Sequence, residues 1–308
     1  MSASELIKGY NKKEAATVFV AVCTDCKYLA PALVAIRSVA MHASEDLDYV
    51  IYVLSEKPLG IIAKRALRAS GETASNIRVE FLVASSSLGN VNLSASGPIK
   101  GVTRATYLRF LLPEMLPDLK KVLYLDVDTV ALGDVSRIYS ESVDGFYLGG
   151  VKDVSGHANA EQRCAELGIG SLNEYVNAGV LLMNLELMRQ DGASEKMLDL
   201  ASKRSFPYND QDVINSFCYG KIKILEYRFN AIVDFLDNPG EVSFALGIDY
   251  EKEASDAVIL HYSGRTKPWY HPKHPLSLHW WETARSFGGF SAFLFKIYQK
   301  RLFTNKKV

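Results

Sequence analysis

Short apolar runs alternate with amphipathic segments along the first three-quarters of this 308-residue chain. Runs rich in β-branched residues predict strands, and apolar positions at a spacing of three and four predict helices. The expected strands cover residues 17–23, 49–54, 77–83, 121–125, 145–151 and 178–184. The expected helices cover residues 30–41, 60–70, 104–116 and 185–202. This alternation predicts an α/β domain with a mainly parallel, mixed sheet.

The pattern weakens after about residue 232. In the C-terminal tail, four apolar residues lie at helical spacing: Phe290, Phe293, Leu294 and Ile297. Several lysines accompany them. A basic, aromatic helix of this kind suits the surface of an anionic membrane, and packing on the core is the alternative. We therefore expect one domain over residues 1–270 and a helical extension over residues 271–308, in contact with a membrane or with the acceptor.

The composition is that of an ordinary globular protein, with 48% apolar residues and with 35 basic side chains balancing 35 acidic ones. A chain without net charge creates no long-range field for nucleic acid, so we expect no such partner. We find no signal peptide and no apolar run of membrane-spanning length, and therefore expect a cytoplasmic protein, with peripheral contact to the inner face of the membrane as the variant. Cys23 and Cys26 form a C-x-x-C pair, but the residues between them are not typical of a redox turn.

The apolar run Lys121–Leu125 ends in two aspartates, Asp126 and Asp128. Residues two apart in an extended backbone point to the same side, so both carboxylates can converge on one divalent cation. A hard cation held by two protein oxygens keeps open positions that a nucleotide diphosphate fills. Two alternatives stay open from these residues alone. One is a solvated turn, and the other is the aspartate-nucleophile motif of haloacid-dehalogenase-type phosphatases, with Asp126 attacking phosphate.

Three further segments accompany this motif: YVNAGVLLMNL at residues 175–185, YNDQDVIN at 208–215 and LHYSGRTKPW at 260–269. In this order and at these separations, the four motifs resemble the family-8 retaining glycosyltransferases, which include bacterial lipopolysaccharide galactosyl- and glucosyltransferases and glycogenin. The resemblance runs from about residue 17 to residue 269. It implies a Rossmann-like, GT-A-type domain for nucleotide-sugar binding.

The activity implied by this resemblance is retaining, metal-dependent transfer of galactose or glucose from a UDP-sugar to a glycan acceptor. The expected acceptor is a lipopolysaccharide or other surface glycoconjugate precursor. The alternatives are the aspartyl phosphatase and a non-catalytic protein that binds a nucleotide sugar.

The resemblance implies that Asp126, Asp128 and His261 hold a Mn²⁺ ion, with Mg²⁺ as the alternative, that bridges the two donor phosphates. Two carboxylates and one imidazole suit Mn²⁺, and the ion neutralises charge on the departing diphosphate. Gly264 would let the backbone approach the phosphates, and Lys267 would add a positive charge. Taken alone, His261 is more typical of a histidine buried in a core.

Five residues would bind the rest of the donor by the same resemblance. Asp153 and Asn177 would bind sugar hydroxyls, and Arg109 would reach the donor. Thr24 and Asp25, at the exit of the first strand, would meet the uracil or ribose. Asp153, Asn177 and Arg109 also have plain structural alternatives as a turn residue, a strand cap and a solvated helix charge.

Residues 209–212, Asn-Asp-Gln-Asp, are typical of a helix start, with Asp210 as its cap. The resemblance places Gln211 beneath the anomeric carbon, with Asp212 close by. Retention needs a nucleophile on that face or a same-face transfer in which the leaving phosphate helps deprotonate the acceptor. Because an amide is a poor nucleophile, we favour same-face transfer, with Gln211 stabilising positive charge and Asp212 as a reserve nucleophile.

The C-terminal extension holds three further histidines, His271, His274 and His279. A proline follows each of the first two, which prevents the helix that usually orients a His-x-x-His metal pair. We therefore assign no second metal site there.

Overall fold

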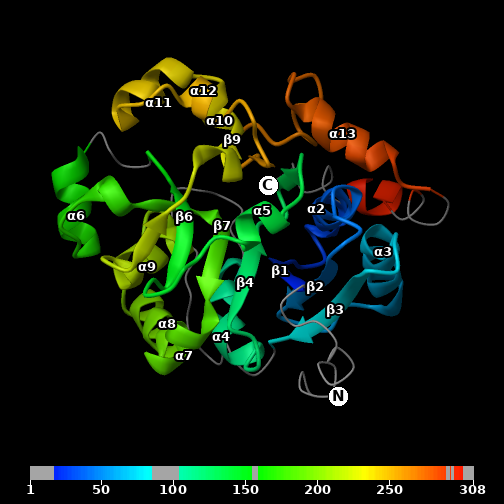
Figure 1. Cartoon of the computed structure of the whole chain (residues 1–308), viewed down its shortest axis with the longest axis horizontal. Coiled ribbons are helices and arrows are strands. Elements are labelled where there is room, and N and C mark those ends of the chain that lie inside the picture. Colours follow the sequence, from blue (N-terminus) through cyan, green and yellow to red (C-terminus); the bar gives the residue numbers. More distant parts are fainter. Residues whose placement is uncertain (1–16, 85–103, 155–158, 289–291, 293–294, 301–308) are drawn as a thin grey trace.

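The computed structural model describes residues 17–84, 104–154, 159–288, 292 and 295–300, and two sheets form its framework (Figure 1). The large sheet has the strand order β3-β2-β1-β4-β7-β6-β8. Its strands are β1 (Thr17–Cys23), β2 (Asp48–Ser55), β3 (Ile77–Val83), β4 (Lys121–Leu125), β6 (Leu148–Lys152), β7 (Val176–Asn184) and β8 (Ile222–Ile224). The small sheet has the order β5-β10-β9, with β5 (Thr129–Ala131), β9 (Ala231–Ile232) and β10 (Ile259–His261).

The large sheet is mixed and mainly parallel, as the sequence predicts. Strands β3, β2, β1 and β4 run parallel to one another. Strand β7 is antiparallel to both of its neighbours, β4 and β6, and β8 runs parallel to β6. The expected class of α/β fold is therefore confirmed.

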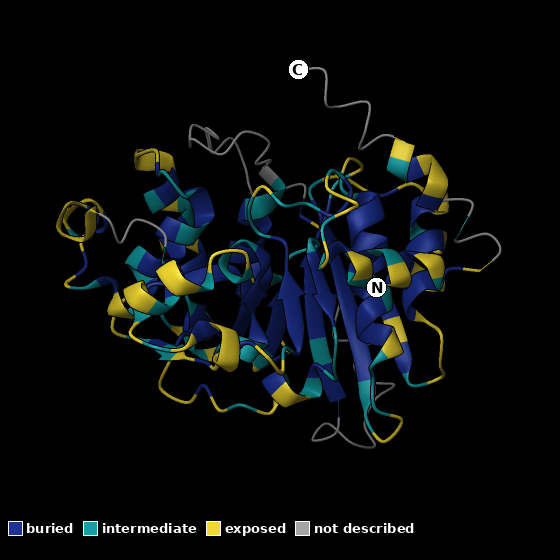
Figure 2. Cartoon of the chain, turned by 90° about the horizontal axis from the view of Figure 1, so that it is seen from above, coloured by how far each residue is buried: buried dark blue, intermediate teal, exposed yellow. Residues whose placement is uncertain are grey.

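The sheet separates two hydrophobic cores, because successive side chains of a strand point to opposite faces. In β1, Val18, Val20 and Val22 enter one core, while Ala21 and Cys23 enter the other. Figure 2 shows the resulting band of buried strands between layers of helices. Both faces of β1 and β2 are covered, which explains why these strands are almost entirely apolar, whereas the edge strand β3 carries the polar residues Arg78 and Glu80.

The first core lies under α2 (Leu29–Met41), α3 (Ile61–Gly71) and α13 (Ser277–Arg285). The second lies under η2 (Arg104–Leu111), α4 (Leu112–Met115), α7 (Leu185–Gln190), α8 (Ala193–Lys203) and α9 (Asn209–Cys218). The remaining helices are α5 (Ser136–Tyr139), α6 (Ala160–Leu167), η4 (Leu172–Glu174), η5 (Tyr227–Phe229), α10 (Val233–Leu236), α11 (Pro239–Leu246) and α12 (Tyr250–Glu253).

Two predicted helices differ from the observed ones. The helix expected over 104–116 is mostly a 3₁₀ helix, η2, and only its last turn, α4, is α-helical, with Pro113 in the first turn where a missing N–H is tolerated. The helix expected over 185–202 is broken into α7 and α8 at Gly192, whose φ of +63° is left-handed.

The described part of the C-terminal extension packs on the first core. Trp280 of α13 is fully buried, and its ring centroid lies 5.7 Å from that of Trp269. Phe295 and Tyr298 are buried as well, whereas Ile297 is exposed. Phe290, Phe293 and Leu294, which the sequence places on the apolar face of the tail, lie outside the described residues. Among the helices that the structure describes, none is both long enough and apolar enough to span a bilayer.

Candidate active site

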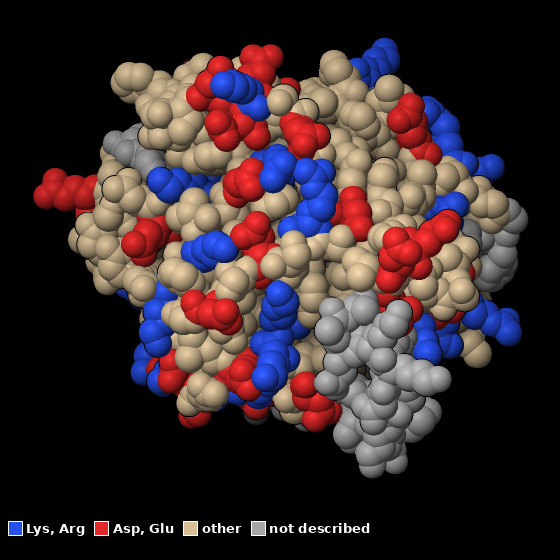
Figure 3. All heavy atoms as spheres, viewed as in Figure 1, with Lys and Arg blue, Asp and Glu red and all other residues tan. Residues whose placement is uncertain are grey.

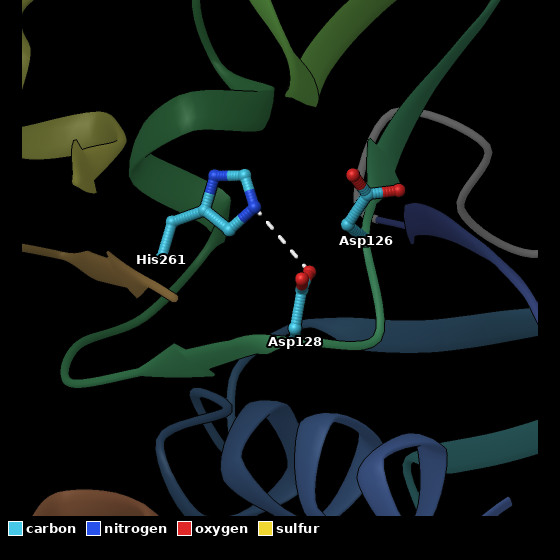
Figure 4. Close-up of side chains that lie close together, drawn as sticks. All are labelled: Asp126, Asp128 and His261. Carbon is cyan, nitrogen blue, oxygen red and sulfur yellow. Dashed lines mark ion pairs between the residues drawn. The ribbon is translucent and has the colours of Figure 1, made fainter. Parts of the chain in front are cut away.

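Two carboxylates and one imidazole lie close together where β4 ends and β10 runs beside β5 (Figure 4). Asp126 and Asp128 lie in the turn between β4 and β5, and the register of β10 places His261 opposite Thr129. One ligand atom from each of Asp126, Asp128 and His261 lies within 4.8 Å of the others. The predicted set is therefore brought together, although His261 follows the two aspartates by more than a hundred residues.

The aspartates converge for a different reason from the one the sequence suggests. Residues 126–128 form a turn and not an extended strand. The main-chain oxygen of Asp126 accepts hydrogen bonds from the amide and the hydroxyl of Thr129, at 3.3 and 2.7 Å. This short loop reverses the chain into β5, and it turns both carboxylates toward β10.

His261 fits into the site because Gly179 has no side chain. A Cβ atom on Gly179 would lie 2.1 Å from Cε1 of the imidazole ring. The glycine of the Asn-Ala-Gly segment therefore makes room for a candidate cation ligand that follows it by 82 positions in the chain.

Hydrogen bonds fix the tautomer of His261. The amide N–H of Gly179 can only donate, and it donates to Oδ1 of Asn177 at 3.0 Å. Nδ2 of Asn230 donates to the same oxygen, so Oδ1 of Asn230 faces Nδ1 of His261 at 3.0 Å. Nδ1 of His261 consequently donates to Asn230, and Nε2 is the ring nitrogen that faces the aspartates.

That Nε2 atom is buried and has no hydrogen-bond partner, although it lies 3.3 Å from Oδ1 of Asp128. Protonation of Nε2 would make this contact an ion pair, and in the neutral ring the Nε2 lone pair would be available to a cation bound beside Asp128. The donor set of two carboxylates and one imidazole suits a divalent cation such as Mn²⁺. The residues present therefore fit the expected ion.

Arg109 and Tyr124 both donate hydrogen bonds to the carboxylate of Asp126. The Arg109 guanidinium lies 2.8 Å from Oδ1 of Asp126, and the Tyr124 hydroxyl donates to the same oxygen at 2.6 Å. Arg109 is buried and also pairs with Asp210, so it is not the solvated helix charge that was its alternative. It orients a candidate cation ligand, and its reach to the donor itself stays a prediction.

Lys267 lies against Asp128 on the open side of the cluster. Its ammonium is 2.5 Å from Oδ2 of Asp128 and also donates to the main-chain oxygen of Tyr262. Burial by itself raises the pKa of Asp128, but Lys267 and His261, through their charges and hydrogen bonds, together outweigh it and hold the pKa well below its usual range. Asp128 is therefore ionised and able to bind a cation at neutral pH.

Gly264 is required by a neighbouring side chain. A Cβ atom there would lie 1.7 Å from Oδ2 of Asp234, whose carboxylate accepts from the amide of Arg265 at 3.0 Å and that of Thr266 at 3.4 Å. The loop thus wraps around Asp234. Its approach to donor phosphates stays a prediction.

A second, more deeply buried cluster surrounds Gln211 at the start of α9. Its Oε1 accepts from the amide of Ala178 at 3.1 Å and from Nδ2 of Asn177 at 3.2 Å. Its Nε2 donates to the Tyr175 hydroxyl at 3.1 Å and to Oδ2 of Asp153 at 3.3 Å. The structure therefore brings Asp153 and Asn177, which are expected at the donor sugar, next to Gln211, which is expected beneath the anomeric carbon, and joins the three to one another. Their contact with a sugar stays a prediction.

Asp212 lies in the protein interior, with no exposed area. Oδ1 of its carboxylate is 2.5 Å from Arg163 and accepts from the Tyr175 hydroxyl at 2.6 Å, and Oδ2 accepts from the amide of Tyr208 at 2.9 Å. A carboxylate enclosed in this way has no open side for a sugar. This placement disfavours Asp212 as the nucleophile that the sequence left open.

Asp210 is buried between the two clusters. The Thr106 hydroxyl donates to it at 2.9 Å, and Arg109 lies 3.1 Å away. Burial raises the pKa of Asp210 to about 6, in spite of the Arg109 charge. Asn209, just before it, is the one non-glycine residue of the described chain with positive φ, at 48°, a conformation that asparagine tolerates better than most residues.

Thr24 and Asp25 follow the end of β1. Because β1 and β4 are parallel neighbours, these residues lie at the same edge of the large sheet as Asp126. Thr24 is buried, and the carboxylate of Asp25 accepts from the amides of Lys27 and Tyr28 at 2.7 and 3.0 Å. Asp25 therefore shapes the turn into α2, and contact of either residue with a nucleoside stays a prediction. Cys23 is a free, buried thiol whose pKa burial raises to about 12, so it does not form a reactive thiolate with Cys26.

The histidines of the C-terminal extension take no part in the site. Within the described residues, the group that satisfies cation-ligand geometry is Asp126, Asp128 and His261. Nε2 of His274 instead pairs with Oδ1 of Asp237 at 2.8 Å.

Sequence reasoning missed several residues that shape the two clusters. They are Arg163, Asn230 and the hydroxyls of Tyr124 and Tyr175. The two tyrosines lie inside the recognised motifs, so an inventory of hydrogen-bonding groups in those motifs would have included them. Arg163 and Asn230 lie outside the motifs and reach the clusters only through tertiary contacts.

The sequence profile described as "Glycosyl transferase family 8" matches residues 19–272. The chain therefore belongs to glycosyl transferase family 8. Membership favours sugar transfer over the phosphatase interpretation of the two aspartates.

Curated relatives match a little more than half of the chain. "General stress protein A" of Bacillus subtilis (strain 168) is 26% identical over 182 residues, which cover 56% of this chain and 62% of the relative. "Lipopolysaccharide 1,2-glucosyltransferase" of Escherichia coli (strain K12) is 30% identical over 173 residues, covering 54% and 50%. The chain thus spans about half the length of the curated relatives it matches.

Solved structures match nearly the whole chain. The galactosyltransferase LgtC in complex with donor and acceptor sugar analogs has a TM-score of 0.71 at 24% identity, over 88% of this chain and 97% of LgtC. The WbbM bifunctional glycosyltransferase has a TM-score of 0.75 at 19% identity, over 93% of this chain and 52% of WbbM. These likenesses confirm the expected GT-A-type fold.

Proposed function

We propose that this protein is a retaining hexosyltransferase that moves galactose or glucose from a UDP-sugar to a glycan acceptor. The acceptor is a lipopolysaccharide or another surface glycoconjugate precursor. Membership of the family and a relative named for lipopolysaccharide glucosyl transfer support this proposal.

The observation that carries the proposal is the unpaired Nε2 atom of His261, which faces Asp128 across 3.3 Å. A buried imidazole nitrogen without a partner is rare in folded proteins unless a ligand completes it. Asp126, Asp128 and His261 would hold Mn²⁺ or Mg²⁺. When bound, the cation neutralises the negative charge that develops on the leaving nucleotide diphosphate.

The protein's own groups surround the reacting centre. Lys267, at the open side of the cation ligands, binds a diphosphate oxygen and adds positive charge. Asp153 and Asn177 bind the hexose from below, and Gln211 presents its polar amide to the positive charge of an oxocarbenium-like state. The leaving phosphate accepts the acceptor's proton on the same face, which retains the anomeric configuration.

The charges on one face of the described residues are mixed in sign. On the face seen in Figure 3, acidic and basic side chains are interspersed. Contact of the basic C-terminal tail with a membrane remains a prediction, because much of that tail lies outside the described residues.

A hydrolysis screen tests the proposal without knowledge of the acceptor. The protein is incubated with Mn²⁺ and, one at a time, UDP-galactose, UDP-glucose and UDP-N-acetylglucosamine, and released UDP is measured. We expect slow release from one of the two hexose donors, which stops on chelation of the ion and resumes when Mn²⁺ is restored. Unchanged turnover in the presence of chelator would exclude the proposed cation dependence.

Two other outcomes would support different functions. Binding of a UDP-sugar with neither hydrolysis nor transfer over a broad acceptor panel would favour a non-catalytic binding protein. Trapping of fluoroberyllate on Asp126 would favour the phosphatase.

A further inference from the structure

A chain of buried hydrogen bonds leads from Gln211 away from the cation ligands and ends on α6. Gln211 donates to the Tyr175 hydroxyl at 3.1 Å, and that hydroxyl donates to Asp212 at 2.6 Å. Asp212 in turn pairs with Arg163 at 2.5 Å. Arg163, Tyr175 and Asp212 are each at least nine-tenths buried.

The direction of every bond in this chain is determined. The amide N–H of Ala178 can only donate, so it fixes Oε1 of Gln211 on its own side and directs Nε2 toward Tyr175. An ionised carboxylate can only accept, so Tyr175 must give its proton to Asp212. The lone pairs of the Tyr175 oxygen are thereby left to accept from Gln211.

The chemistry of Tyr175 agrees with this direction. Burial, together with the charge of Asp212, raises the pKa of the Tyr175 hydroxyl well above its usual value, so the hydroxyl keeps the proton that it donates. Arg163 balances the charge of the carboxylate that receives this bond. Without such a partner, a fully buried carboxylate would be strongly destabilising.

We propose that Arg163, Asp212 and Tyr175 are positioning residues that fix the amide of Gln211 at the reacting centre, and that Asp212 acts through Tyr175 and not as a nucleophile. This inference rests on the proposed transfer reaction. All in-plane positions of the Gln211 amide are taken by Ala178, Asn177, Tyr175 and Asp153, so the amide meets the substrate with its flat face and cannot rotate. Fixed dipoles of this kind stabilise developing charge without reorganisation.

The test is a double-mutant cycle of Tyr175→Phe and Gln211→Ala, with donor hydrolysis as the rate. Tyr175→Phe removes one oxygen atom and keeps the ring, so the fold is expected to survive. We expect kcat to fall about tenfold, with KM for the donor changed less than about threefold, because a single buried hydrogen bond is lost. In the Gln211→Ala background, the same change should alter kcat less than about twofold.

Tyr147→Phe is the matched control. The Tyr147 hydroxyl also donates to an aspartate, Asp191, at 2.6 Å, but it makes no contact with Gln211. We expect this variant to keep the wild-type kcat. An equal loss of kcat in Tyr147→Phe, or a Tyr175→Phe effect that is the same in both backgrounds, would overturn the inference.

A second readout does not depend on turnover. The side-chain amide signals of Gln211, assigned by their absence in Gln211→Ala, should shift and exchange faster with solvent in Tyr175→Phe, and stay unchanged in Tyr147→Phe. Unaltered Gln211 signals in Tyr175→Phe would overturn the positioning role. A wild-type protein that turns over no donor but shows the expected shifts would refute the proposed function and leave the positioning role standing.

Discussion

The two polar clusters of the site are built on opposite principles. The cluster of Asp126, Asp128 and His261 lies partly open and leaves Nε2 of His261 without a partner. The cluster around Gln211 is buried, and all four hydrogen-bonding positions of its amide are occupied by protein groups. One cluster is therefore incomplete until a ligand arrives, whereas the other is complete and rigid.

This difference separates recognition from positioning. A buried imidazole nitrogen that makes no hydrogen bond, beside two carboxylates, offers an incomplete set of donor atoms that a cation would complete. The saturated amide of Gln211 has no position left for a further hydrogen bond, but its dipole is held in place for a charge that exists only in the transition state. Substitutions should therefore change cation affinity, and turnover with it, in the first cluster, but turnover alone in the second.

The largest effect is expected from Asp128→Ala. This change removes a candidate cation ligand and also the charged partner of Lys267. We expect donor turnover to fall below detection and Mn²⁺ binding to be lost, with the thermal unfolding curve little changed. The control is Asp118→Ala, at an exposed position ahead of β4. This variant should keep both donor turnover and Mn²⁺ binding. A wild-type rate in Asp128→Ala would show that the first cluster holds no essential ion.

A smaller loss is expected from Gly179→Ala. The added methyl group would collide with the His261 ring and displace it from the aspartates. We expect Mn²⁺ affinity, measured by electron paramagnetic resonance of the free ion, to fall about 10- to 100-fold. Gly133→Ala is the control, since its nearest neighbour would be 3.8 Å from the new atom. Equal Mn²⁺ affinity in Gly179→Ala and wild type would contradict this role of the glycine.

The second cluster is tested by Asp212→Asn. If Asp212 only directs Tyr175, turnover should fall about tenfold, comparable to the loss of one hydrogen bond, and Mn²⁺ affinity should stay unchanged. The melting temperature is measured in parallel, because Arg163 loses its charged partner. A nucleophile would instead be indispensable, and mass spectrometry would find a glycosyl adduct on Asp212 after reaction with a slow fluorinated donor.

The smallest effect concerns Asp210, between the clusters, and appears as a pH dependence of stability. Its pKa is about 6 in the folded protein, against about 3.9 in an unfolded chain. Between these values the unfolded state has lost the proton that the folded state still holds, so this group lowers stability as pH rises through that window. The loss is at most about 3 kcal/mol and is constant above about pH 6.

Asp210→Asn removes this titration. From pH 4 to pH 6.5 its melting temperature should rise relative to that of the wild type by a few degrees, measured by scanning fluorimetry. Asp46→Asn, at an exposed position, should differ from the wild type in melting temperature by the same amount at every pH. If the melting temperature of Asp210→Asn differed from that of the wild type by the same amount at pH 4 and pH 6.5, the raised pKa of Asp210 would be contradicted.

Local sequence was sufficient where short-range physics dominates. The six predicted strands are all present, because β-branched runs bounded by polar residues have few alternatives. The position of Asp126 and Asp128 after β4 followed from the same run. The 3₁₀ geometry of η2 and the break at Gly192 were missed, since packing and a single left-handed residue decide them.

The amino-acid sequence by itself determined the order of the six longest strands of the described chain, the apolar character of the central strands and the motifs that resemble a sugar-transferring family, whereas the short strands β5, β8, β9 and β10 were not predicted. The tertiary structure alone decided that Asn230 turns His261 toward the aspartates, that Gly179 leaves space for its ring, and that Arg163 and Asp212 support Gln211. The physical reason is the separation along the chain over which each interaction acts. Strand and helix preferences arise between residues a few positions apart, whereas hydrogen-bond direction and steric fit exist only once distant segments touch.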